Sequence, residues 1–206
     1  MGTTRTSDTH PLWINEIRAG DAGGLVGITF CPGKRGHALG GFRWERSLSV
    51  DLDVIAQWNP SAMLTLIEDH EFTMLGVPAL GAEVRKRGIT WHHMPITDVQ
   101  PPDARFETAW CTHGADLVNI VRAGGRVLVH CRGGLGRAGT VAARILVELG
   151  HAGADAVDMV RAARPGAIET RAQWSYVMRL AGDASKAAGA GNRGNPTQGG
   201  DPHGLV

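Results

Sequence analysis

The chain has 206 residues, of which 43% are hydrophobic, and its formal net charge at pH 7 is +1. This length and apolar content suit one globular domain with a core of its own, and they exclude a wholly disordered chain. The near-neutral charge gives no support for a nucleic-acid partner, and no apolar run approaches the roughly 18 residues that a membrane span needs.

Three segments are distinguished by composition. Residues 1–10 are polar and are predicted to be a flexible lead. Residues 11–182 are predicted to form the single domain. Residues 183–206 are rich in glycine, alanine and asparagine, and we expect a disordered tail because few apolar side chains are available for burial.

Strands and helices are predicted to alternate along the first half of the domain. Helices end where the residue before a proline avoids the helical conformation, as at Asn59-Pro60, or at a glycine such as Gly88. The expected elements, in chain order, are strands Leu12–Ile17 and Leu25–Phe30, helix Val50–Trp58, strand Ala62–Ile67, helix Val77–Arg87 and strand Ile89–Ile96.

The second half continues the same alternation. Asp103 can cap a long helix that reaches about Ala123, and the predicted elements after it are strand Arg126–Val129 and helices Ala138–Leu149, Ala154–Ala163 and Thr170–Ala181. This order predicts an α/β fold, with a central, mostly parallel sheet of four to five strands and helices on both of its faces.

The segment between strand Arg126–Val129 and the following helix carries the chemistry. It reads His130-Cys131-Arg132-Gly133-Gly134-Leu135-Gly136-Arg137. A loop between a strand and a helix start can surround a phosphate with backbone amides, and its glycines let the backbone bend. A helix N-terminus, such amides and a guanidinium all favour the thiolate form of a cysteine, which is the nucleophile.

Each member of this loop receives a predicted role. Cys131 is the expected nucleophile, and the planar fork of Arg137 suits two parallel hydrogen bonds to phosphate oxygens. His130 is expected to orient the cysteine, and the predicted substrate-binding residues are His130, Arg132, Gly133, Gly134, Leu135 and Gly136. The alternative is a glycine-rich turn with a buried cysteine, which we consider the weaker interpretation.

His-Cys-x5-Arg resembles the phosphate-binding loop of the cysteine-dependent protein tyrosine and dual-specificity phosphatases. The form found here is most similar to the kinase-associated phosphatase group, also called cyclin-dependent kinase inhibitor 3. Further segments that fit this resemblance are Cys31–Lys34, His92–Asp98 and Gly166–Gln173. The resemblance implies the phosphatase fold and hydrolysis of phosphotyrosine, with phosphoserine and phosphothreonine as further substrates, through a phosphocysteine.

Proton transfer requires a further residue. The resemblance implies that Asp98 is the general acid and then the general base, whereas an Asx turn that opens a proline-rich loop is the structural alternative. Asp103 is the other candidate for the acid, but its predicted position as the helix N-cap already accounts for an aspartate there. Gln173 forms a capping box with Thr170, and the resemblance also implies that it positions the attacking water.

One residue departs from the family pattern. The position after the loop arginine usually carries serine or threonine, and here it is Ala138. The hydroxyl at that position helps the thiolate leave, so the departure predicts slow breakdown of the phosphocysteine.

Other polar residues have weaker interpretations. Arg132 could attract a multiply phosphorylated substrate, but a solvated arginine on the surface is the favoured interpretation. The same two interpretations apply to Lys34 and Arg35. His92 and His93 alternate along a strand and are not expected to bind a metal together. No metal or cofactor is predicted.

The three cysteines, an odd and sparse set, favour a reducing compartment, and the cytoplasm is expected. Cys111 is predicted to pack in the core beside Trp110. Cys31 precedes a loop and could act as a resolving thiol for Cys131, but this interpretation is not favoured.

The leading functional hypothesis is a phosphatase that acts on a phosphorylated protein or peptide. The alternatives are a phosphoinositide or other small-molecule phosphatase, a phosphate-binding module with slow turnover, and a rhodanese or arsenate reductase. Nothing in the sequence specifies an oligomeric state.

Overall fold

A five-stranded sheet forms the centre of the computed structural model, which describes residues 3–37 and 41–191. Its strand order is β2-β3-β8-β6-β7, with bounds β2 Asn15–Ala19, β3 Gly24–Phe30, β6 Ala62–Thr65, β7 Thr90–His93 and β8 Arg126–Cys131. Strands β3, β8, β6 and β7 are parallel, and β2 joins the edge antiparallel to β3. The predicted fold class, an α/β domain with a mostly parallel sheet, is confirmed.

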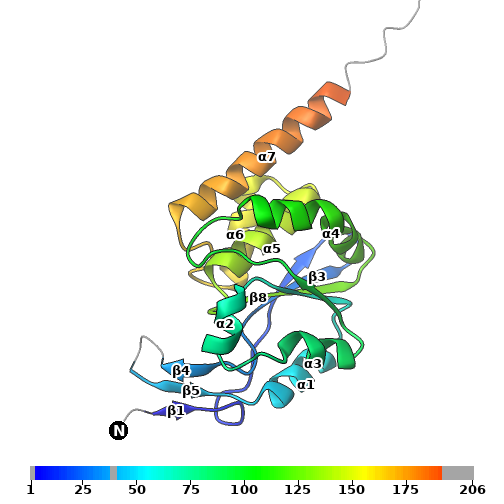
Figure 1. Cartoon of the computed structure of the whole chain (residues 1–206). Coiled ribbons are helices and arrows are strands. Elements are labelled where there is room, and N and C mark those ends of the chain that lie inside the picture. Colours follow the sequence, from blue (N-terminus) through cyan, green and yellow to red (C-terminus); the bar gives the residue numbers. More distant parts are fainter. Residues whose placement is uncertain (1–2, 38–40, 192–206) are drawn as a thin grey trace, which may run out of the picture.

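Helices cover both faces of this sheet (Figure 1). One face packs against helices α4 Ala104–Arg122, α5 Gly136–Glu148, α6 Gly153–Ala163 and α7 Arg171–Gly191. The other face packs against α1 Leu48–Trp58 and α3 Leu80–Lys86. The central strand β8 supplies both cores, because successive side chains of a strand point to opposite faces: Val127 and Val129 lie in the first core and Leu128 in the second.

Two features were not predicted. A short helix, α2 Asp69–Met74, follows β6, and a second sheet of three strands has the order β1-β5-β4. Its strands are β1 Thr4–Arg5, β4 Arg35–His37 and β5 Arg43–Glu45. This small sheet lies beside α2 in Figure 1, and the Arg35 N–H donates to the carbonyl of Leu75 at 2.9 Å, at the end of that helix.

The chain ends differ from the expected boundaries. The expected flexible lead contains β1, which pairs with β5, so part of it belongs to a sheet. Helix α7 continues to Gly191, past the expected start of the tail, and residues 192–206 lie outside the described residues.

The observed bounds of some elements also differ from the predicted ones. The strand predicted at Leu12–Ile17 begins at Asn15, because Trp13 is 71% exposed and the segment before Asn15 pairs with no strand of the main sheet. Helix α4 begins where it was predicted to, since the Asp103 carboxylate accepts hydrogen bonds from the backbone N–H groups of Arg105 and Phe106.

Candidate active site

The loop from His130 to Arg137 lies at the carboxyl end of β8, the central strand, and leads into α5. Gly134 has a φ of +69°, and a Cβ atom at this residue would lie 2.6 Å from the backbone of Thr29 on the neighbouring strand β3. Only glycine therefore fits this close approach. The Gly134 N–H donates to Cys131 Sγ at 3.3 Å, and Cys131 is only 4% exposed. The loop thus curls around the sulfur of the predicted nucleophile.

His130 is fully buried behind this loop, between β8 and β6. Its Nε2 lies 2.7 Å from Thr65 Oγ1, and its Nδ1 lies 3.4 Å from the carbonyl oxygen of Cys131. Burial is the main cause that lowers the pKa of His130 to about 3, so the ring is neutral at ordinary pH. A carbonyl can only accept, so Nδ1 carries the proton and the Thr65 hydroxyl donates to Nε2. The neutral imidazole therefore braces the backbone of the predicted nucleophile.

Arg137, in the first turn of α5, is held from outside the loop by Glu71. Its Nη1 donates to Glu71 Oε2 at 2.5 Å and its Nη2 donates to Glu71 Oε1 at 3.0 Å. Burial alone would lower the pKa of Arg137, but the hydrogen bonds to Glu71 and the negative charges of Cys131, Glu71 and Asp98 together raise that pKa above its usual value. Within the part of the chain that the structure describes, Arg137 Nε is buried without a hydrogen-bond partner. That N–H is therefore available to donate to an anionic ligand.

Glu71 was missed by the sequence analysis. It lies in α2, where its Oε2 also accepts from the backbone N–H of Glu68 at 2.8 Å, as part of a capping box. Burial would raise the pKa of the Glu71 carboxyl, but Arg137 and the Glu68 amide lower it, so the carboxylate stays charged. The Glu68-x-x-Glu71 spacing is a capping signal that could have revealed α2, but no local pattern indicates the partner Arg137.

Asp98 forms an ion pair with the same arginine. Its Oδ1 is 2.9 Å from Arg137 Nη2, and its side chain is half exposed to solvent. The next residue, Val99, has a φ of +55°, a left-handed conformation that β-branched residues avoid. The loop that carries Asp98 is therefore held in place by its surroundings rather than by its own backbone preference. Asp103, the rival acid, is used as the cap of α4.

Gln173 ties this acid loop to α7. It forms the predicted capping box with Thr170, since each backbone N–H donates to the other side chain at 3.2 Å. Its Nε2 also donates to the carbonyl of Gln100 at 3.2 Å. The capping interpretation is confirmed, while the part that Gln173 plays toward water stays a prediction.

Two further residues touch the loop and were not singled out from the sequence. Arg164, at the end of α6, donates to the carbonyls of Gly134 at 3.1 Å and Gly133 at 3.2 Å. These contacts occupy the carbonyls on the outside of the loop. The Glu169 carboxylate accepts from the Gly136 N–H at 2.7 Å, and a Cβ on Gly136 would lie 2.5 Å from Glu169 Oε2.

The position after Arg137 offers no hydroxyl. Ala138 is fully buried at the start of α5, and the nearest candidate hydroxyl in sequence, that of Thr140, donates to the Gly136 carbonyl at 2.7 Å. This hydroxyl is engaged in an intrahelical bond. The structure therefore provides no substitute from Thr140 for the missing serine or threonine.

The remaining cysteines lie outside the phosphate loop. Cys31 is buried with a free thiol, and burial raises its pKa well above the usual value, so it is an unreactive thiol in this state. Cys111 is exposed, which corrects the predicted core position. Residues next to each other on a helix differ by about 100° in direction, so Cys111 turns to solvent while Trp110 packs inward.

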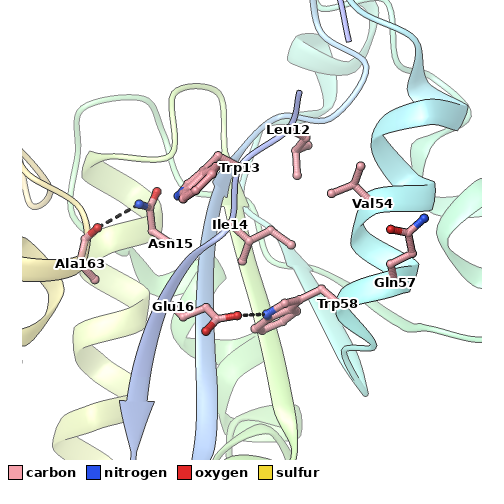
Figure 2. Close-up of a pocket in the computed structure, with 9 residues that line it drawn as sticks. All are labelled: Leu12, Trp13, Ile14, Asn15, Glu16, Val54, Gln57, Trp58 and Ala163. Atoms are coloured by element: carbon pink, nitrogen blue, oxygen red, sulfur yellow. Dashed lines mark hydrogen bonds between the residues drawn. The ribbon is translucent and has the colours of Figure 1, made fainter. Parts of the chain in front are cut away.

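A cleft of about 590 Å³ opens at the phosphate loop. It is lined by the two carboxylates Asp98 and Glu169, by the loop residues Arg132, Gly133 and Leu135, and by residues of α2 and the small sheet. A separate pocket of about 710 Å³ lies between β2, α1 and the end of α6 (Figure 2). Its one carboxylate, Glu16, already accepts from Trp58 Nε1 at 2.6 Å, and the pocket contains no nucleophile. The candidate active site therefore lies at the cleft of about 590 Å³, whose lining residues Arg132 and Gly133 directly follow Cys131 and which also contains Asp98.

The sequence matches the family described as "Swiss Army Knife protein, DSP-PTPase phosphatase domain" over residues 61–177, more than half of the chain. It is 34% identical over 171 residues to human (Homo sapiens) cyclin-dependent kinase inhibitor 3, which covers 82% of this chain and 76% of that protein. It is also 34% identical to the rat (Rattus norvegicus) protein of that name, over 65% of this chain and 63% of that relative, just under two thirds of its length.

Solved structures agree with these sequence matches. A crystal structure of kinase associated phosphatase, with its catalytic-site cysteine substituted by serine, superposes with a TM-score of 0.72 at 25% identity, and covers 85% of this chain and 97% of that one. In the part of the chain that the structure describes, no helix is both long and apolar enough to cross a membrane.

Proposed function

This chain belongs to the family of dual-specificity and protein tyrosine phosphatases, and on that premise we propose that it hydrolyses phosphomonoesters of phosphoproteins through a phosphocysteine on Cys131. The observation that carries this proposal is the convergence of three side chains on one loop. Cys131 Sγ accepts from a loop amide, Arg137 is fixed by Glu71, and Asp98 lies 2.9 Å from the same guanidinium.

The first step forms a sulfur–phosphorus bond. The Cys131 thiolate attacks phosphorus in line with the leaving oxygen, while the loop amides and Arg137 stabilise the negative charge on the other phosphate oxygens. The bond to the leaving oxygen breaks, and Asp98 in its protonated form donates a proton to that oxygen. Because Asp98 is half exposed at the mouth of the cleft, it can meet a leaving group that comes from a bulky substrate.

The second step releases phosphate. A water molecule attacks the phosphocysteine, Asp98 accepts its proton, and the sulfur leaves as a thiolate. Gln173 is proposed to position this water, since it already joins the acid loop to α7 through Gln100. With Ala138 in place of a hydroxyl residue, the thiolate lacks one donor as it leaves, so this step is expected to be slow.

The decisive experiment is turnover of an aryl phosphate by the purified, reduced protein. The wild type should release phosphate, and Cys131→Ser, Arg137→Lys and Asp98→Ala should each lower the rate strongly. Absence of wild-type activity would overturn the enzyme proposal, and activity untouched by Cys131→Ser would overturn the mechanism.

The small, odd set of cysteines supports a cytoplasmic location as part of the proposal.

A second candidate function is a phosphoinositide or other small-molecule phosphatase, and the basic residues Lys34, Arg35 and Arg132 along the cleft favour it. A third is a phosphate-binding module with slow turnover, which Ala138 favours. Relative rates on phosphopeptides and inositol phosphates separate the first two. Stoichiometric labelling of Cys131 without later release would support the third.

A further inference from the structure

The outer edge of strand β2 pairs with no other strand in the part of the chain that the structure describes. β2 is the first strand in the sheet order, and its one neighbour is β3. Hydrogen bonds fix the strand from its two faces: Asn15 donates to the Ala163 carbonyl of α6 at 2.9 Å, and Trp58 of α1 donates to Glu16 at 2.6 Å (Figure 2). The backbone groups on the outer edge are a template for pairing with a further strand.

The hydrogen bonds of β3 show which residues of β2 turn their backbone to this edge. The Leu25 N–H donates to the Gly125 carbonyl at 3.0 Å, on the side of β8, so it does not bond to Arg18, its neighbour in β2. Hydrogen-bonded and non-hydrogen-bonded pairs alternate along an antiparallel ladder, so Ile17 bonds to β3. The N–H and C=O groups of Glu16 and Arg18 therefore face outward.

The two residues that face outward carry opposite charges. Glu16 and Arg18 are both exposed, and they lie on one face of the strand because they are two residues apart. The hydrogen bond from Trp58 uses Glu16 Oε1, and the second oxygen has no partner among the described residues. Within those residues, the side chain of Arg18 forms no hydrogen bond or ion pair either. Both charges are therefore available to a partner at the edge.

Pairing of β2 with the same strand of a second copy brings these charges together. A homodimer has a two-fold axis, so an antiparallel pair centred on Ile17 puts Glu16 of each copy directly opposite Arg18 of the other. Residues opposite each other have Cβ atoms about 4.5–5.5 Å apart, close enough for an ion pair. An axis at Glu16 or at Arg18 would instead place two like charges opposite each other. The charges thus favour the register centred on Ile17 over these two neighbours.

The groove of about 710 Å³ beside β2 suits the same register. Its lining includes Ile14 and Trp13, which is 71% exposed (Figure 2). With the axis at Ile17, the turn of the second copy, residues 20–23, comes beside this groove, and Gly20 lies opposite Ile14. The turn reads Gly-Asp-Ala-Gly, and a Cβ on Gly20 would meet nothing within 4 Å. Bulky residues before the strand and small ones after it make the edge complementary to itself.

We propose that a second copy of this chain binds the outer edge of β2, and that the two five-stranded sheets join through an antiparallel pair of β2 strands centred on Ile17. The β8 strands of the two copies then run in opposite directions, so the two candidate active sites lie toward opposite ends of the joined sheet. The pairing does not depend on the proposed phosphatase activity. A short edge and one groove form a small interface, so the dimer should dissociate at micromolar concentrations.

Sedimentation velocity of the full chain over a series of concentrations tests this pairing. The wild type should be in equilibrium between monomer and dimer. Arg18→Glu and Glu16→Arg each place like charges opposite each other, so each should raise the dimer dissociation constant by about tenfold or more. In an equimolar mixture of the two variants, opposite charges face each other again, and a mixed dimer should form about as tightly as in the wild type.

The matched control for Arg18→Glu is Lys86→Glu, which makes the same change of charge on the surface of α3 and should keep the wild-type dissociation constant. A wild type that stays monomeric at every concentration would overturn the proposal and leave the edge to a partner of another kind. A dimer that both variants leave intact, or a mixture that associates no more tightly than either variant alone, would overturn this interface.

Thermal unfolding of each variant shows whether it is folded. Glu16→Arg loses the hydrogen bond from Trp58, so Arg18→Glu carries the test if Glu16→Arg does not fold. In that case Arg18→Pro replaces the mixture, because it removes an N–H that faces the edge and no bond to β3, and proline is tolerated on edge strands. Arg18→Pro should also weaken the dimer, and a dimer as tight as the wild type would contradict strand pairing.

Discussion

Replacing Glu71 by glutamine tests whether the charge of this residue holds the arginine of the phosphate loop. The substitution keeps the size of the side chain and removes its negative charge. In the wild type, both Glu71 oxygens accept from Arg137, at 2.5 and 3.0 Å, and both side chains are at most 2% exposed. In the variant, one of these oxygens becomes an NH2 group, which faces N–H donors of Arg137 or Glu68.

The size of the effect follows from what remains around Arg137. Removing one partner of a buried ion pair costs about 3–5 kcal/mol, because the other charge stays buried. Arg137 keeps the Ile96 carbonyl at 3.1 Å and Asp98 at 2.9 Å, so the low end, about 3 kcal/mol, is expected. For a domain of this size, that loss lowers Tm by about 6–12 °C. A guanidinium that shifts by about 1 Å should lower kcat/KM roughly a hundredfold.

Thermal unfolding and steady-state hydrolysis of 4-nitrophenyl phosphate measure the two effects, with kinetics recorded well below the variant's Tm. Glu83→Gln is the control, because Glu83 pairs with Lys86 and Arg87 on the surface of α3, far from the loop in sequence. The control should match the wild type in both measurements. If Glu71→Gln changed Tm by less than about 2 °C and kcat/KM by less than about threefold, Glu71 would not be what holds Arg137.

Three other outcomes are expected. Ala138→Ser should raise the steady-state rate by speeding breakdown of the phosphocysteine, and the wild type should show a burst of product about equal to enzyme; a linear wild-type time course would contradict this. Asp98→Asn should lower kcat/KM, which reports formation of the phosphocysteine, by about 10²–10⁴-fold for phenyl phosphate and less for 4-nitrophenyl phosphate, whose leaving group needs no proton, so equal losses would argue against an acid role. The pKa of His130 is lowered to about 3 in the folded state, so below about pH 6.5 only the unfolded chain gains this proton, and the free energy of unfolding should fall by about 1.4 kcal/mol per pH unit from this group. The free energy of unfolding, measured with urea at a series of pH values, should depend less steeply on pH in His130→Asn than in the wild type. Equal pH dependence in the two proteins would refute the lowered pKa of His130.

The chemistry of the phosphate loop could be predicted because its parts are contiguous. Cys131, the three glycines and Arg137 lie in one short segment that runs from the end of a strand to the first turn of a helix, and the local pattern specifies both elements. The same holds for the Asp103 cap and for the box formed by Thr170 and Gln173, where donor and acceptor are only a few residues apart. Short-range hydrogen bonds of this kind depend on residue type and spacing alone.

The supports of the loop could not be predicted in this way. Glu71 reaches Arg137 across 66 residues of sequence, and Lys34 reaches the Arg132 carbonyl across 98. Each contact exists because β6 and β3 flank β8 in the sheet, so that the segments that leave their carboxyl ends meet at the loop. Local propensity says nothing about which strands become neighbours.

The sequence by itself thus predicted the nucleophile and the phosphate-binding arginine, and it determined the fold class and the family to which the chain belongs. Only the tertiary structure decided that Glu71 fixes the arginine, that Arg164 holds the loop carbonyls, and that an early lysine lies buried beside the site. The physical reason is the same in each case. A loop that binds an anion can be specified by a few adjacent residues, whereas the charges that hold it are brought together by burial of both faces of the sheet.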